Sequence, residues 1–115
     1  MAGYRIPGPI GLNPTSQGLK HSIDENTRIL AATAYGEGSG KNVFEEMAAI
    51  ANVLVRQQKA RGYPTVAAFI KVDTTFAFAA HDGSPRYAKL MMASAAEIAK
   101  DTAMEAAIRA ARNAL

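Results

Sequence analysis

The sequence predicts an all-α fold with four or five helices and one short extended or β-like loop. Apolar residues make up 49% of the 115 residues, and alanine is prominent among them. Such a composition, with little clustering of β-branched residues, favours closely packed helices. Helix-capping patterns precede the long apolar segments, and the apolar residues within those segments recur at helical spacing. A single domain of 23–115 is therefore expected.

The segment 1–22 is rich in glycine and proline, with polar residues between them. This composition predicts a flexible leader. The alternative is a delivery or docking tail.

The first helix is predicted over 23–35. Ser22 followed by Glu25 forms a capping box at its start, and Gly36 is expected to end it. Arg28 is expected to lie outside, on the solvent face. The predicted buried face consists of Ile29, Leu30, Thr33 and Ala34.

The second helix is predicted from a capping box at Asn42 and Glu45 to about Ala60, with Gly62 as its stop. Its core face is drawn from residues at helical spacing, namely Val43, Met47, Ile50, Ala51 and Leu54.

The sequence after Gly62 predicts one short helix, one loop and one long helix. Thr65 can cap a helix from Val66 to Lys71 or Val72, and Phe76 and Phe78 then alternate as in a short strand or extended loop.

Asp82-Gly83 is a turn signal, and Ser84-Pro85 starts a long Ala-rich helix. A break is expected at Asp101-Thr102, where Thr102 and Glu105 form a further capping box. By their spacing, the predicted core positions of this region are Leu90, Met91, Ala95, Ile98, Met104 and Ile108.

Composition narrows the classes of function. The net charge is +3, and the chain has no cysteine, which excludes a disulfide framework, a thiol nucleophile and a thiolate metal site. The basic residues are scattered, and those of the last helix alternate with acidic ones as on a solvated face, so no nucleic-acid partner is expected. The two histidines have no zinc-ligand spacing, and no metal or other cofactor is expected. No apolar run approaches the roughly 20 residues of a membrane span.

The stretch Tyr35 to Lys41 carries the candidate chemistry. It looks like a phosphate loop, but Tyr35 stands where that loop needs glycine. In addition, Lys41 is followed by Asn42, where the loop needs serine or threonine to bind magnesium. Nucleotide binding is therefore rejected. Glu37 remains, between two glycines that let a ligand approach closely, with Tyr35 as an apolar surface beside it. One interpretation is a solvated surface carboxylate; the other is an acid that donates a proton to a leaving oxygen.

The segment from Tyr35-Gly36-Glu37 to Arg56 resembles the SleB-like cell-wall hydrolase family, typified by the spore cortex-lytic enzyme. The family motif Tyr-(Ala/Gly)-Glu is followed by a helix whose spacing from Glu37 to Arg56 agrees without a gap. Tyr63-Pro64-Thr65-Val66 and the stretch from Phe76 to Asp82-Gly83 are similar to later family segments.

This resemblance implies a lysozyme-like helical domain that cleaves the glycan strands of peptidoglycan, as a lytic transglycosylase or a muramidase. It implies that Glu37 is the catalytic acid. Glu46 is a second candidate catalytic residue, which either activates water or positions Glu37. Asp73 and Asp82 are further candidates for a second carboxylate. The candidate substrate-binding residues are Tyr35, Phe76, Phe78, His81 and Asp82.

The chain departs from the family pattern at three places. Lys41 replaces the second motif glutamate, Val55 replaces an asparagine for which Asn52 can substitute, and the sequence ends at Leu115 before the family's aromatic-rich segment. We therefore expect a domain shortened at its C-terminus, or a groove completed by a second chain. The alternative function is a non-catalytic helical module that binds glycan or protein.

No secretory signal pattern opens the sequence. If the chain acts on the cell wall, we expect it to be cytoplasmic before delivery by a phage lysis system or a contact-dependent machine such as type VI secretion. An immunity protein would then be a partner.

Overall fold

The computed structural model describes residues 23–38, 40–41 and 43–115. Regular structure within these ranges is helical throughout, so the predicted all-α class is confirmed. The elements are α2 (Glu25–Glu37), α3 (Phe44–Ala60), α4 (Val66–Val72), the 3-10 turn η1 (Phe78–Ala80), α5 (Pro85–Met92), α6 (Ala95–Lys100) and α7 (Thr102–Ala114). The predicted leader 1–22 lies outside the described residues.

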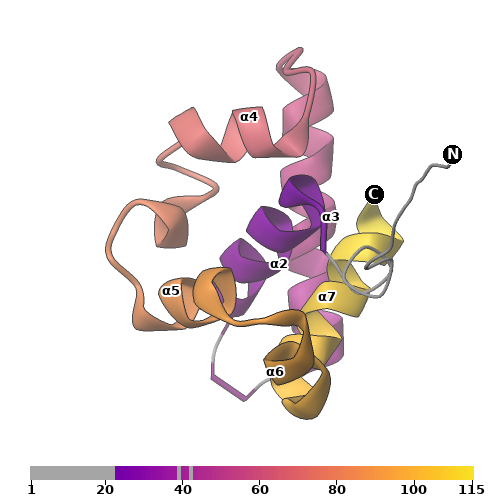
Figure 1. The fold of residues 1–115 in the computed structure, drawn as a ribbon. Coiled ribbons are helices and arrows are strands. Elements are labelled where there is room, and N and C mark those ends of the chain that lie inside the picture. Colours follow the sequence, from indigo (N-terminus) through magenta and orange to yellow (C-terminus); the bar gives the residue numbers. More distant parts are fainter. Residues whose placement is uncertain (1–22, 39, 42) are drawn as a thin grey trace, which may run out of the picture.

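Helix α2 is the central element of the fold (Figure 1). Helices α3, α4, α5 and α7 and the turn η1 all pack against it. Every residue from Ile29 to Tyr35 is buried. A helix that is buried on all sides needs neighbours around its whole circumference. Ala31, Ala32 and Ala34 let those neighbours approach closely.

The start and end of α2 differ from the prediction. Its N-cap is Asp24, whose carboxylate accepts from the backbone N–H and the hydroxyl of Thr27, each at 2.9 Å. The expected cap Ser22 lies outside the described residues. Gly36 does not end the helix, which continues to Glu37 and stops at Gly38.

Helix α3 ends as predicted, because Gly62 follows it with a φ of +78°. Its N-cap position is occupied by Val43, which makes no side-chain capping bond. The expected cap Asn42 lies outside the described residues. The buried face contains Met47, Ala51 and Leu54, whereas Val43 is 41% exposed.

The predicted long C-terminal helix is divided into three. Ser84 caps α5 as expected, with Tyr87 N–H donating to its hydroxyl. An unexpected break falls at Ser94, which forms a complete capping box with Glu97. The expected break at Asp101 is confirmed, but Asp101 rather than Thr102 is the cap of α7. The apolar residues expected in the core are fully buried except Met91 and Ala95, which are partly buried.

Arg28 holds the C-terminus of α5 against α2. Its Nη1 donates to the carbonyl oxygens of Leu90, Met91 and Ala93 at 2.8, 3.3 and 2.8 Å. The last carbonyls of a helix have no partner within it, and a nearby cation also complements the helix dipole. Arg28 is therefore a structural residue, and the prediction that it lies outside is wrong.

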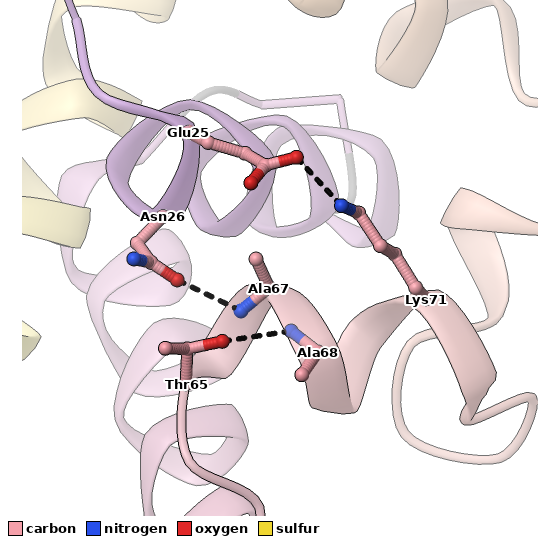
Figure 2. A network of polar contacts seen from close by, with 6 residues as sticks. All are labelled: Glu25, Asn26, Thr65, Ala67, Ala68 and Lys71. Carbon is pink, nitrogen blue, oxygen red and sulfur yellow. Dashed lines mark hydrogen bonds and ion pairs between the residues drawn. The ribbon is translucent and has the colours of Figure 1, made fainter.

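Helix α4 is held on the first turn of α2 by polar contacts (Figure 2). The side chain of Asn26 accepts from Ala67 N–H at 3.0 Å, and the Thr65 hydroxyl accepts from Ala68 N–H at 3.1 Å. Thr65 is thus the predicted cap, and Asn26 is a second cap supplied by another helix. Lys71 also pairs with Glu25 at 2.6 Å in an exposed ion pair. Among the helices the structure describes, none is long and apolar enough to cross a membrane.

Candidate active site

Glu37 lines an open cavity of about 360 Å³ between α2, α3 and the loop that follows α4. This volume is at the lower end of the range for small-ligand sites. One wall is a face of α3, and the other is formed by Thr75 and Phe76. The residues of the α3 wall are Ala49, Ile50, Val53 and Leu54.

The last turn of α2 places Glu37 at this cavity. Because the helix extends one residue past Gly36, the Glu37 side chain projects from a helix end and not from a free loop. Its Oε2 accepts from the backbone N–H of Ala79 at 2.6 Å. This contact joins two residues 42 positions apart in the chain. The carboxylate is therefore held by both α2 and η1.

Gly36 allows η1 to approach α2 this closely. A Cβ atom at Gly36 would lie 2.9 Å from the Cβ of Ala79, 3.2 Å from the hydroxyl oxygen of Ser84 and 3.2 Å from the Cβ of Tyr87. Gly36 thus marks the point where α2, η1 and the start of α5 meet. Partial burial raises the pKa of the Tyr87 hydroxyl above its usual value of 10.0, and the positive charge of Lys71 opposes this rise.

Asp73 organises the loop that forms the second wall. Its Oδ2 accepts from the backbone N–H groups of Thr75, Phe76 and Ala77 at 3.1, 2.6 and 2.9 Å. The residue is only 9% exposed. Asp73 therefore serves the loop backbone, and we do not retain it as a candidate for a second catalytic carboxylate.

Glu46, the other predicted catalytic residue, lies behind the turn that follows Glu37. Its Oε1 is 3.4 Å from the position that a Cβ at Gly38 would take. Glu46 is partly buried and does not line the cavity. The role of Glu46 therefore stays a prediction.

Tyr35 was expected to form an apolar wall beside Glu37, but the structure places it in the core. Its side chain is 3% exposed. The guanidinium of Arg86 lies 3.8 Å from the centre of the Tyr35 ring, and Arg86 Nε donates to the Tyr35 carbonyl at 2.8 Å. Arg86 therefore caps the end of α2 instead of lying on the solvated face expected for it. Both differences follow from the burial of α2 on all sides.

The remaining predicted substrate-binding residues are only partly brought together. Phe76 lines the cavity, and the Arg61 guanidinium lies 5.3 Å from the centre of its ring. Phe78 is 54% exposed but does not line the cavity. His81 Nε2 lies 2.7 Å from the Ile70 carbonyl, and because a carbonyl only accepts, Nε2 carries the proton. Asp82 accepts from Ser84 N–H in the predicted turn.

Sequence reasoning missed the α3 wall and the Ala79 N–H. The α3 wall could have been found from the sequence. The apolar residues of α3 cover a wider arc of the helix than its buried face needs, and Ile50 and Val53 fall beside that face. The Ala79 donor could not have been found from the sequence. Every residue except proline carries a backbone N–H, so no pattern marks the one that contacts Glu37.

Within the described residues, no group of three or more His, Cys, Asp or Glu side chains is placed to hold a metal ion. Comparisons with protein-family models, with curated proteins and with solved structures give no match to this chain.

Proposed function

We propose that this chain cleaves the glycan strands of peptidoglycan, with Glu37 as general acid and then base. The observation that carries the proposal is the place of Glu37: a carboxyl group at the end of the buried helix α2, on an open cavity, with one oxygen held by Ala79 N–H at 2.6 Å. General acid catalysis needs a proton donor fixed next to the leaving oxygen. The motif around Tyr35-Gly36-Glu37 supports the choice of glycan strands as substrate.

The surroundings of Glu37 favour lytic transglycosylase chemistry over hydrolysis. Among the cavity-lining residues in the described part of the chain, Glu37 alone bears a carboxylate. Hydrolysis requires a second carboxylate to activate water or to form a covalent intermediate. Asp73 is committed to the loop, and Asp82 does not line the cavity.

In the proposed reaction, Glu37 donates its proton to the glycosidic oxygen as the bond from that oxygen to the anomeric carbon breaks. The 6-hydroxyl of the same sugar attacks the anomeric carbon and closes a 1,6-anhydro ring. Glu37 then takes the proton of that hydroxyl, so the carboxyl group is restored without water.

The Glu37→Gln variant tests this function. Glutamine retains an oxygen that can accept from Ala79 N–H, so we expect the fold to persist and cleavage of purified peptidoglycan to fall by about 10²–10⁴-fold. Mass analysis should find anhydro-muramyl ends in the wild-type digest. Glu45→Gln, an exposed carboxylate in the first turn of α3, is the matched control and should cleave normally. Full cleavage by Glu37→Gln would refute the role of Glu37, and reducing ends would select a muramidase.

A second candidate is a non-catalytic module that binds glycan or protein. The observation in its favour is that Glu37 and Thr75 are the sole polar residues lining the cavity within the described chain. A wild-type protein that binds purified glycan strands but releases no product would support this candidate.

The proposed site of action is the cell wall, reached by a phage lysis or contact-dependent route. We expect expression directed to the bacterial periplasm to cause lysis and cytoplasmic expression to be harmless. The reverse pattern would contradict this.

A further inference from the structure

We propose that Asp73 is a positioning residue for Glu37, acting through the 73–80 loop, which comprises Asp73 to Ala80 and includes η1. This inference rests on the proposed function of Glu37. It assigns to Asp73 a role different from a second catalytic carboxylate, and it is carried by three consecutive contacts.

The first contact is between Asp73 and its own loop. One carboxylate oxygen accepts three successive backbone N–H groups, from Thr75, Phe76 and Ala77. A buried backbone N–H needs a partner, and Ala77 is fully buried. The single oxygen of Asp73 therefore fixes the path of the chain up to the start of η1.

The second contact is between η1 and Glu37. Within η1 the N–H of Ala80 bonds to the Ala77 carbonyl, and the N–H of His81 bonds to the Phe78 carbonyl. The N–H of Ala79 instead leaves the loop and donates to Glu37 Oε2. The position of this donor is thus set by the loop that Asp73 organises.

The third contact is the packing of η1 against α2. Ala79 lies against Gly36, where an added Cβ would approach Ala79 Cβ to 2.9 Å, a separation that forces a shift. Gly36 and Asp73 therefore fix η1 from two sides. Loss of either moves the Ala79 donor and with it the carboxyl group. A displacement of about 1 Å at a reacting group can lower a rate by about 100-fold.

The test compares Asp73→Ala with Asp73→Asn, which keeps a side-chain oxygen for the loop N–H groups. Two quantities are measured: kcat and KM on soluble glycan-strand fragments, and the amide proton shift of Ala79 in ¹⁵N-labelled protein. We expect Asp73→Ala to lower kcat by about 10–100-fold with little change in KM, and to move the Ala79 amide signal. Asp73→Asn should retain most of kcat and a signal close to wild type.

Two further variants complete the design. Asp101→Asn is the matched control, because Asp101 also accepts a backbone N–H but lies at the start of α7, away from the cavity; it should leave kcat and the Ala79 signal unchanged. Gly36→Ala leaves Asp73 intact and displaces η1 from the other side. It should also lower kcat and move the Ala79 signal. If Asp73→Ala does not fold, this variant still tests the step from η1 to Glu37, and unchanged kcat with an unmoved signal would overturn the inference.

The outcomes separate this inference from the proposed function. Wild-type kcat together with an unmoved Ala79 signal in Asp73→Ala would overturn the positioning role. If the wild type cleaves no glycan, the proposed function fails. The Ala79 signal then still decides whether Asp73 positions the Glu37 carboxyl, because Glu37→Gln and Asp73→Ala should both move it.

Discussion

At the scale of single residues, Gly36 shapes the surroundings of the candidate residue Glu37. Glycine costs about 1 kcal/mol relative to alanine inside a helix. Gly36 is nevertheless inside α2, because Ala79, Ser84 and Tyr87 all meet the position of its missing side chain. Tertiary packing therefore outweighs the local preference of the helix at this position.

Gly36→Ala should lower the free energy of unfolding, although the same change usually stabilises a helix. The added methyl group meets Ala79 Cβ at 2.9 Å, and overpacking of this kind costs about 1–3 kcal/mol. The helix preference for alanine offsets about 1 kcal/mol of this, so we expect a net loss of up to about 2 kcal/mol. Urea unfolding at neutral pH measures it. Gly38→Ala is the control, because its backbone is extended and its nearest contact is 3.3 Å, so its effect should be smaller. Equal effects of the two variants would contradict the packing role of Gly36.

At the scale of elements, three helix ends are bound by side chains of other helices, in addition to the packing of the apolar core. Arg28 binds the C-terminus of α5, Arg86 binds the Tyr35 carbonyl at the end of α2, and Asn26 caps α4. Each of these three side chains belongs to a different helix from the end that it binds. Local caps such as Asp24, in contrast, bind the end of their own helix. The relative placement of short helices is therefore determined by long-range polar contacts together with the alanine-rich core.

Arg28→Met should destabilise the protein by about 2–3 kcal/mol, because the carbonyls of Leu90, Met91 and Ala93 lose a charged donor. Methionine preserves much of the side-chain length, so the effect reports the hydrogen bonds. The midpoint of urea unfolding measures the change. Arg56→Met, at an exposed position of α3, should alter stability by no more than about 0.5 kcal/mol. A comparable effect of both variants would show that general loss of positive charge is responsible.

At the scale of the whole molecule, two helix caps link stability to pH. The backbone N–H of Thr27, helped by its hydroxyl, holds the pKa of Asp24 below the usual value of 3.8. The backbone N–H of Met104, with a smaller contribution from Lys89, does the same for Asp101. Because both pKa values are lower in the folded than in the unfolded state, the stabilisation is complete above about pH 4 and is lost as the pH falls through the folded values.

The double variant Asp24→Asn, Asp101→Asn should lose less stability than wild type between pH 6 and pH 3. Asparagine is as good an N-cap as aspartate but does not titrate. Urea midpoints of both proteins at the two pH values measure the difference. Both caps are largely solvated, so we expect a modest effect. An identical loss in both proteins would place the acid sensitivity in other carboxylates.

Local sequence signals were sufficient for most of the helices. Thr65 and Ser84 are the caps that were predicted, and Gly62 follows the end of α3. The four residues predicted to be buried in α2 are buried, although burial extends around the whole helix from Ile29 to Tyr35. These features depend on residues within about one helical turn of each other, which the sequence displays directly. The capping box of Ser94 and Glu97, which divides the predicted long helix, is a local signal of the same kind.

The sequence by itself determined the helical class of the protein and singled out Glu37 among its carboxylates. Tertiary structure alone decided what surrounds Glu37. Tyr35 is in the core, Asp73 holds a loop, and Ala79 supplies a hydrogen bond from 42 residues away. The physical reason is that these surroundings come from segments far apart in the chain. The missing side chain at Gly36 allows Ala79 of η1 to pack closely against α2, but the sequence around Gly36 does not show which segment will pack there.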